Sequence, residues 1–176
     1  MAEIEIEYCS PSLADVDSLS QLGRETFVAT FGHLYSNEDL DFFLENAFHP
    51  DAIQNDLSNT AFQYRVAHDC NKNHRMIAYC KIGPLRVPIV PLGRAIEIWQ
   101  LYVRVPYHRN GVGREMMNWA MSRCSLTGAN EVYLSVWSGN HRAIRFYERF
   151  GFSKVGTYDY MVGKQADHEF IFCRTI

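Results

Sequence analysis

The stretch YHRNGVGREMM, residues 107–117, decides how the rest of this chain is interpreted. It places two glycines and several basic side chains between an apolar, strand-like run and a helical pattern. Glycine permits a tight turn, and it also lets a ligand approach the backbone closely. Amide groups at the start of a helix lack partners and carry partial positive charge. The stretch therefore predicts either a turn that caps a helix or a cradle for a phosphorylated ligand.

Two common phosphate-binding motifs do not fit this stretch. A dinucleotide fingerprint needs a third glycine three residues after the second, and that position is Met116. A Walker loop needs Lys and then Ser or Thr after its last glycine, whereas Gly113 is followed by Arg114 and Glu115. Any phosphorylated ligand is therefore expected to be held differently from NAD or ATP in their usual sites.

The periodicity on both sides predicts alternating strands and helices. Strands are expected at residues 4–8, 62–67, 76–82, 95–105, 131–137, 152–160 and 169–174. Helices are expected at residues 12–30, 36–48, 50–57, 112–127 and 140–150. Ser12 with Asp15, and Ser36 with Asp39, are typical of helix starts. Because a helix separates strands 95–105 and 131–137, these two are expected to be parallel in an otherwise antiparallel sheet.

The composition is that of an ordinary globular protein. Hydrophobic residues make up 47% and charged residues 21% of the 176, and the formal net charge is −3. This excludes a disordered chain and lacks the basic surplus typical of nucleic-acid binding. The apolar runs are too short to span a bilayer, and the acidic, alternating start MAEIEIEYCS is unlike a signal peptide. We expect one cytoplasmic domain, residues 1–176, with no nucleic-acid and no membrane partner.

The cysteines predict reduced thiols rather than a disulfide framework. Their number is odd and no pair forms a C-x-x-C motif. They are Cys9, Cys70, Cys80, Cys124 and Cys173. His68 and His74 lie close in sequence to Cys70 and Cys80, but the spacing matches no standard zinc pattern, and DCNKNHR (69–75) is typical of a hairpin turn. We expect no metal.

Two motifs together resemble those of the GNAT superfamily of acetyl-CoA-dependent N-acetyltransferases. IWQLYV followed by PYHRNGVG is similar to motif A, Gln/Arg-x-x-Gly-x-Gly/Ala, with His108 in place of the first residue. NHRAIRFYERFGF, residues 140–152, is similar to motif B, and it matches at Asn140, Ala143, Tyr147, Gly151 and Phe152. The order of the elements also fits that family along nearly the whole chain.

The resemblance implies an α/β (α+β) fold of the GNAT type. Its mixed, mostly antiparallel, twisted sheet would have about seven strands, with one central parallel pair splayed apart and about four to five flanking helices. It also implies acetyl-CoA as co-substrate. Backbone groups of Leu101 and Val103 would meet the acetyl and pantetheine groups, and amides near Gly111 and Gly113 the pyrophosphate. The full set implied to contact the cofactor is Leu101, Tyr102, Val103, His108, Arg109, Asn110, Gly111, Val112, Gly113, Arg114, Asn140, Ala143 and Tyr147.

Glu97 and Tyr147 are the candidate catalytic residues. A free primary amine has a pKa of about 10.4, so a base is useful at neutral pH. Glu97 alternates with apolar neighbours, and its spacing to His108 is similar to that of the base in several family members. The alternative is a solvent-facing strand glutamate. Tyr147 titrates near the thiol leaving group, at about 10, which suits proton donation. The alternative for Tyr147 is packing on one face of its helix.

The acceptor is expected to be a primary amine of a small molecule. TFGHLYSNEDLDFF (30–43) and YMVGKQADHEF (160–170) are similar to the spermidine/spermine (PaiA-type) branch of the family, which suggests a polyamine. Tyr35, Glu38, Trp99 and Trp137 are the candidate substrate residues. Acids in a first helical turn also complement the helix dipole without any ligand. A protein amine, a non-catalytic acyl-CoA sensor and a homodimer remain open alternatives.

Overall fold

A computed structural model describes residues 4–176 of the chain. Seven strands form a single sheet in the order β1-β2-β3-β4-β5-β7-β6. The strands are β1 (Ile6–Cys9), β2 (Gln63–Asp69), β3 (Arg75–Gly83), β4 (Ala95–Val103), β5 (Glu131–Trp137), β6 (Ser153–Val162) and β7 (Gln165–Thr175). The helices are α1 (Val16–Phe31), α2 (Asn37–Ala47), α3 (Pro50–Ser58), α4 (Val112–Leu126) and α5 (His141–Arg149). Short 3-10 helices lie at η1 (Leu13–Asp15), η2 (Gly32–Leu34) and η3 (Val105–Tyr107).

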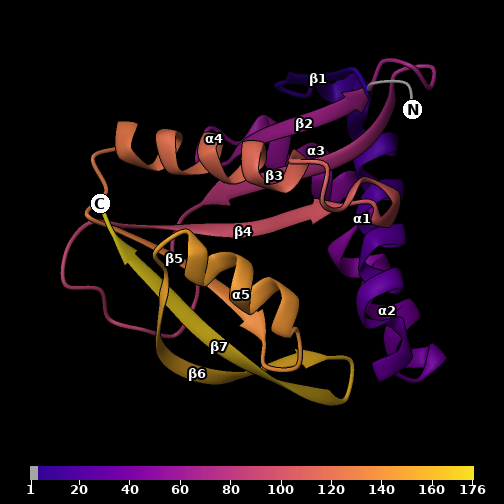
Figure 1. The fold of residues 1–176 in the computed structure, drawn as a ribbon. Coiled ribbons are helices and arrows are strands. Elements are labelled where there is room, and N and C mark those ends of the chain that lie inside the picture. The colour runs from indigo at the N-terminus through magenta and orange to yellow at the C-terminus, as the bar shows by residue number, and fades with distance from the viewer. Residues whose placement is uncertain (1–3) are drawn as a thin grey trace.

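The helices cover both faces of this sheet (Figure 1). The apolar side of α4, including Met116, Met117 and Ala120, packs on Ile96 and Ile98 of β4 to form the main core. On the other face, Leu19 and Leu22 of α1 pack against β2 and β3. A third cluster joins α1, α2 and β6, and its buried members are Phe27, Leu44, Phe48 and Val162. The spacing of the apolar residues along each helix thus selects the face that it buries.

The first helices begin where the polar signals in the sequence predict. Ser12 and Asp15 form a reciprocal capping box, which starts η1 and leads into α1. The Ser36 hydroxyl accepts a hydrogen bond from the Asp39 amide at 3.1 Å and caps α2. Pro50 occupies the first turn of α3. The serine caps satisfy amides that have no partner within the helix, and proline has no such amide to satisfy, so these residues favour the observed helix starts.

The central strands pair in parallel over a short distance and then separate. β4 and β5 are matched only from Ala95 opposite Glu131 to Glu97 opposite Tyr133. Beyond that point the two arrows diverge toward α1 and α2 (Figure 1). The other neighbouring strands are antiparallel. The expected mixed sheet with a splayed parallel pair is therefore confirmed, and the strand–helix–strand order around α4 explains it, because a parallel connection needs a crossover.

A β-bulge lies just beyond this separation. Lys81 of β3 is opposite Gln100, whereas the next residue, Ile82, is opposite Ile98. Trp99 is therefore the extra residue on β4. A bulge increases local twist and re-aims the backbone, and such irregularities are common beside functional sites.

The last hairpin differs from the expectation. Strands were expected at 152–160 and 169–174, but β6 and β7 run to Val162 and from Gln165, around a turn at Gly163 with φ of 59°. The intervening residues pair because they gain tertiary contacts: the Lys164 amide donates to Asp39 at 2.8 Å, and Tyr35 donates to Asp167. This extension brings Asp167 into the interior.

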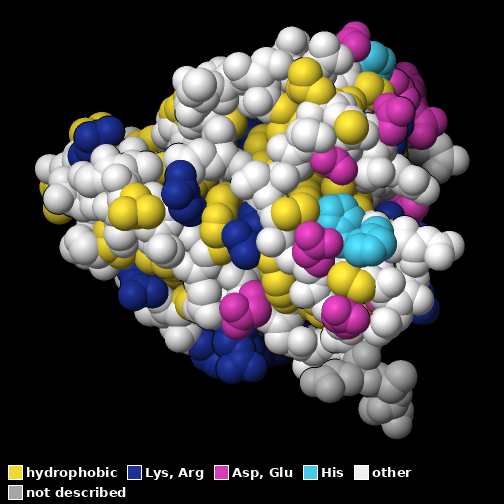
Figure 2. All heavy atoms as spheres, turned by 90° about the horizontal axis from the view of Figure 1, so that it is seen from above, with side chains coloured by type: hydrophobic (Ala, Val, Ile, Leu, Met, Phe, Trp, Pro, Cys, Tyr) yellow, Lys and Arg dark blue, Asp and Glu magenta, His cyan; other side chains and the backbone are white. Residues whose placement is uncertain are grey.

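The outer surface mixes both signs of charge. Figure 2 shows basic side chains mainly toward the left and lower edges of one face and acidic ones mainly on the right. Across residues 4–176, none of the helices has both the length and the apolar character needed to cross a bilayer.

Candidate active site

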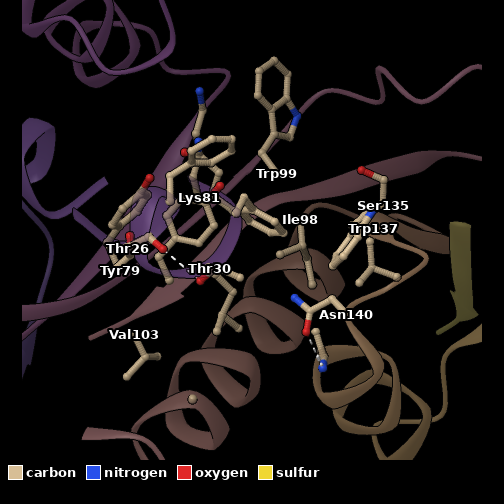
Figure 3. A pocket seen from close by; sticks show the side chains of 18 of the residues that line it. Thr26, Thr30, Tyr79, Lys81, Ile98, Trp99, Val103, Ser135, Trp137 and Asn140 are labelled. Atoms are coloured by element: carbon tan, nitrogen blue, oxygen red, sulfur yellow. Dashed lines mark hydrogen bonds between the residues drawn. The ribbon is translucent and has the colours of Figure 1, made fainter. Parts of the chain in front are cut away.

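A cavity of about 1370 Å³ extends from the start of α4 through the gap between β4 and β5 to α1 and α2. Figure 3 shows side chains from several elements around it, including Thr26 of α1, Lys81 of β3, Val103 of β4 and Trp137 of β5. A cavity of this size can hold an extended ligand together with a smaller one.

The start of α4 presents open backbone to one end of the cavity. Gly111 has φ of 82° and precedes the helix, and the first helical hydrogen bond runs from the Glu115 amide to the Gly111 carbonyl at 3.1 Å. The amides of residues 112–114 therefore come before the hydrogen-bond ladder. A Cβ built on Gly111 would meet nothing within 4 Å, so glycine is needed there for its conformation. The glycine turn and the unpaired amides, which the sequence suggested as alternatives, are thus both present at the start of α4.

His108 connects the end of β4 to α5. One ring nitrogen lies 2.7 Å from the Val103 carbonyl oxygen, and the other lies 2.8 Å from the Arg142 guanidinium. Burial lowers the pKa of His108, and the positive charge of Arg142 lowers it further, against the opposing hydrogen bond to Val103. The ring is therefore neutral near pH 7, so it contributes polarity rather than charge at this end of the cavity.

The other predicted cofactor residues cluster around the same end. Asn140 caps α5 by accepting from the Ala143 amide at 3.2 Å. Leu101 and Val103 point their side chains toward the main core, whereas Tyr102 points to the opposite face and packs against Phe48 and Tyr79. The predicted residues that line the cavity are Leu101, Tyr102, Val103, His108, Arg109, Gly111, Gly113, Arg114, Asn140, Ala143 and Tyr147. Asn110 and Val112 are outside the lining, and Val112 is buried in the core.

Tyr147 is both packed against the core and exposed to the cavity, as its two interpretations from the sequence require. Its ring packs against the main core and meets Phe146 and Phe152, while the residue lines the cavity. Burial raises the pKa of Tyr147, and the nearby Cys80 and Glu169 raise it further. The phenol therefore keeps its proton at neutral pH and can donate it. Its role as the acid stays a prediction.

Glu97 is completely buried and bound to one loop. Its carboxylate accepts from the amides of Arg86 and Val87 at 2.7 and 3.0 Å, and from Arg86 Nε at 2.9 Å. Its side chain is 0% exposed, which rules out the solvent-facing alternative. Among the described residues lining the cavity, Arg86 is present and Glu97 is not. Glu97 therefore acts on the cavity only indirectly, through its ion pair with Arg86. Its role as the base stays a prediction.

Three of the four predicted substrate residues line the cavity, namely Tyr35, Trp99 and Trp137. Tyr35 and Trp137 lie at its inner end, where their rings meet Phe27 and Phe31 of α1. Trp99 packs elsewhere, against Phe62. Glu38 is exposed on α2 and does not belong to the described lining. Two neighbouring acids are engaged within the protein, because Asp39 accepts from Ser36 and the Lys164 amide, and Glu45 pairs with Arg24 at 2.9 Å.

Sequence reasoning missed Asp167 and Glu169 of β7, which both line this inner end. The Asp-x-Glu alternation was a usable signal, because alternate residues of a strand share a face. Asp167 is buried and accepts from the Tyr35 hydroxyl. Burial raises the pKa of Glu169 to about 7, helped by the charge of Asp167 and opposed by a hydrogen bond to Ser135 and the charge of Arg86.

The thiols are free, and residues 4–176 contain one cluster of possible metal donors. All five cysteines lack a disulfide partner. Ligand atoms of Glu7, Cys70 and His74 lie within 4.8 Å of one another at the β2–β3 turn and β1, with two of the three residues exposed. Exposed polar groups often come together without binding a metal, and the expectation of no metal stays a prediction.

A split parallel pair, a glycine turn before an open helix start and a continuous cavity define an acyltransferase-like site. The family model described as "Acetyltransferase (GNAT) family" matches residues 22–152. The chain therefore belongs to the GNAT family of acetyltransferases, and it is an enzyme of that class.

Individual proteins agree with this assignment. An uncharacterized N-acetyltransferase from Lactobacillus delbrueckii subsp. lactis is 24% identical over 166 residues, which cover 92% of each chain. The structure is similar to PaiA N-acetyltransferase from Thermoplasma acidophilum in complex with coenzyme A, with a TM-score of 0.77, 20% identity and coverage of 98% of this chain and 100% of that chain. It is also similar to NAA60 from Arabidopsis thaliana in complex with a bisubstrate analogue, with a TM-score of 0.77, 19% identity and coverage of 98% and 99%.

Proposed function

We propose that residues 1–176 act as one domain that transfers the acetyl group of acetyl-CoA to a primary amine of a small molecule. The amine attacks the thioester directly while both substrates are bound. The observation that carries the proposal is the single cavity that joins the open start of α4 to Tyr147 and to the aromatic pocket at Tyr35 and Trp137. Separate binding sites for the two substrates would not allow direct attack, whereas one cavity brings them together.

The donor half of the cavity suits coenzyme A. The amides before the α4 hydrogen-bond ladder and the side chains of Arg109 and Arg114 provide an anion site for a pyrophosphate. β5 leaves β4 after Glu97, so the following backbone of β4 has a free edge. The amide-rich pantetheine arm can bind this edge as an added strand would. The coenzyme A complex of the PaiA relative supports this assignment.

The chemistry then requires a polarised carbonyl and a proton for the thiolate. A backbone amide near the Trp99 bulge can donate to the thioester oxygen, where negative charge develops during attack. As the nitrogen–carbon bond forms and the carbon–sulfur bond breaks, the Tyr147 hydroxyl gives its proton to the departing sulfur. Burial raises the pKa of Tyr147, so the phenol is fully protonated at neutral pH. The same shift makes it a weaker acid than a free tyrosine, and proton transfer to the sulfur is less closely matched than the sequence suggested.

The inner end of the cavity favours a cationic acceptor, and a polyamine is our preferred class. Phe27, Tyr35 and Trp137 supply aromatic surface, and Asp167 and Glu169 supply negative charge. Aromatic faces and carboxylates together attract ammonium groups, which a polyamine carries on a flexible apolar chain. Glu38 is not needed for this binding, because it is exposed on the outside of α2.

An acceptor screen tests the proposal. Release of free thiol from acetyl-CoA is measured with spermidine, n-butylamine and a peptide bearing a free α-amine. We expect turnover with a higher kcat/KM for spermidine than for n-butylamine, because only spermidine carries additional positive charge. Exclusive use of the peptide would overturn the small-molecule assignment. Acetyl-CoA binding without thiol release above the hydrolytic background would support a sensor and overturn catalysis.

A further inference from the structure

We propose that the carboxylate of Glu169 accepts the proton that the acceptor amine must lose before it attacks. This inference rests on the proposed acetyl transfer and names the group that makes its amine nucleophilic. Glu169 lines the same cavity as Tyr147 and Trp137, and it comes from β7 rather than from β4, where the base was expected.

The sheet register aims Glu169 at the acceptor half of the cavity. Glu169 is opposite Trp137 on β5 and opposite Tyr158 on β6. Directly opposed residues of antiparallel strands share a face, so these three side chains lie on one side of the sheet. That side packs on α1, because the Trp137 ring meets Phe31 at 6.2 Å. Trp137 also ends β5, which has by then separated from β4.

The surroundings of Glu169 keep its carboxyl group poised for proton transfer. Partial burial disfavours its charge most, and Asp167 of the same strand adds to this effect, while Ser135 of β5 and Arg86 of the 84–94 loop favour the charged form. The result is a pKa raised to about 7, well above that of an ordinary carboxyl group. A base is most effective when its pKa lies near the working pH. The phenols that also feel the charge of Glu169 belong to Tyr35, Tyr102, Tyr147, Tyr158 and Tyr160.

Glu97, unlike Glu169, does not line the cavity, and its carboxylate is fully engaged by one loop. Both its oxygens already accept hydrogen bonds from Arg86 and Val87, and it is completely buried. An incoming ammonium group would therefore have to displace the loop to reach it. Glu97 instead positions Arg86, which lines the cavity.

The protons and electrons of the reaction balance with Glu169 and Tyr147 alone. The ammonium form of the amine gives one proton to Glu169, and its freed electron pair forms the nitrogen–carbon bond. The carbon–sulfur bond breaks, and the thiolate takes the proton of Tyr147. The second proton of the nitrogen returns to the Tyr147 phenolate, and Glu169 releases its proton to water. The products are an amide and free coenzyme A, with one net proton released.

The decisive experiment compares Glu169→Gln with wild type, using acetyl-CoA and spermidine between pH 5.5 and 9. We expect kcat/KM of the wild type to fall below about pH 7 as Glu169 becomes protonated. Glu169→Gln should lower the rate at pH 7.5 by about 100-fold or more and abolish this acidic limb, the fall of kcat/KM below about pH 7. The KM for acetyl-CoA should stay unchanged. Glu148→Gln is the matched control, because Glu148 is exposed on α5 and outside the described lining, and it should behave as wild type.

Thermal unfolding verifies that the Glu169→Gln variant is folded and tests the environment of Glu169 independently. A carboxyl group whose pKa is higher in the folded than in the unfolded state holds its proton more tightly when the protein is folded. The free energy of unfolding of the wild type therefore falls as pH rises from about 4.5 to about 7. Glu169→Gln should therefore melt at a higher temperature than wild type at pH 8.5, with the difference shrinking toward pH 5.

Each other outcome identifies what is wrong. If Glu169→Gln keeps the acidic limb and stays within about threefold of the wild-type rate, the inference is overturned. If Glu97→Gln removes the limb instead, the base is Glu97. If wild type releases no thiol with spermidine, n-butylamine or the peptide, the proposed function itself fails, and the inference fails with it.

Discussion

At the scale of single residues, Tyr147 illustrates why position in the sequence alone could not separate packing from chemistry. Its ring completes an aromatic group on α5, yet the residue also borders the cavity. Packing needs the ring, whereas proton donation needs only the hydroxyl. Removing the hydroxyl therefore separates the two roles.

We expect Tyr147→Phe to lower kcat by about 10²-fold while the KM for acetyl-CoA and the melting temperature change little. The phenylalanine ring keeps the contacts with Phe146 and Phe152 but has no proton to donate. Steady-state kinetics with spermidine measures the effect. Tyr8→Phe on β1, outside the described cavity lining, serves as control. An unchanged kcat would remove Tyr147 from the proton transfer.

At the scale of elements, the start of α4 answers the question raised by its two glycines. Gly111 adopts a conformation that most residues avoid, so the turn requires it. Gly113 lies inside the helix, where alanine is favoured, and its Cβ would lie 3.8 Å from the Phe146 ring, an ordinary contact. The turn therefore does not require Gly113, but a glycine there leaves room for the close approach of a ligand to this backbone, as the proposed pyrophosphate cradle needs.

Gly113→Ala accordingly tests the cradle without disturbing the turn. We expect its KM for acetyl-CoA to rise about tenfold or more, since an added methyl group would obstruct the approach of the pyrophosphate in the proposed cradle, while stability stays equal or increases by up to about 1 kcal/mol. Gly128→Ala is the control. Gly128 follows the C-terminal end of α4, far from the proposed cradle at its start, and it has φ of 72°. That variant should lose stability by about 1 kcal/mol and keep its KM. Equal KM values in all three proteins would contradict the cradle.

At the scale of the whole molecule, the two halves of the sheet meet only briefly at β4 and β5. Three register pairs join these strands before they separate. A ligand that binds along the free edge of β4 links both halves, and a ligand that binds only the folded state stabilises it.

We expect saturating acetyl-CoA to raise the melting temperature by about 5–10 °C. At a concentration of about 100 times Kd, the gain is about 2.7 kcal/mol, and a domain of this size gains about 2–4 °C per kcal/mol. ATP carries phosphates but no pantetheine arm, so it should give a smaller shift in the same thermal scan. Equal shifts with the two ligands would argue against binding between β4 and β5.

Most of the fold could be predicted because its signals are local. Alternating strands, caps such as Ser36, and the helix between β4 and β5 each depend on neighbours in sequence. The hairpin of β6 and β7 was expected to be shorter, because Asp39 and Tyr35, which stabilise its tip, are distant in sequence. The candidate site divides in the same way: the contiguous α4 start was predicted, whereas Asp167 and Glu169 were missed.

The sequence by itself determined the order of elements, the parallel pair and the glycine turn, because periodicity, capping and glycine conformation act over a few residues. Only the tertiary structure decided which carboxylates face the cavity. Glu97 alternates with apolar neighbours as expected, but the 84–94 loop folds back and binds both its oxygens. Glu169 looks like an ordinary strand residue, but the pairing of β7 with β5 and β6 partly buries it, with Asp167 on the same face, and this raises its pKa. Burial and charge at one atom depend on segments brought together from the whole chain, and no local pattern specifies them.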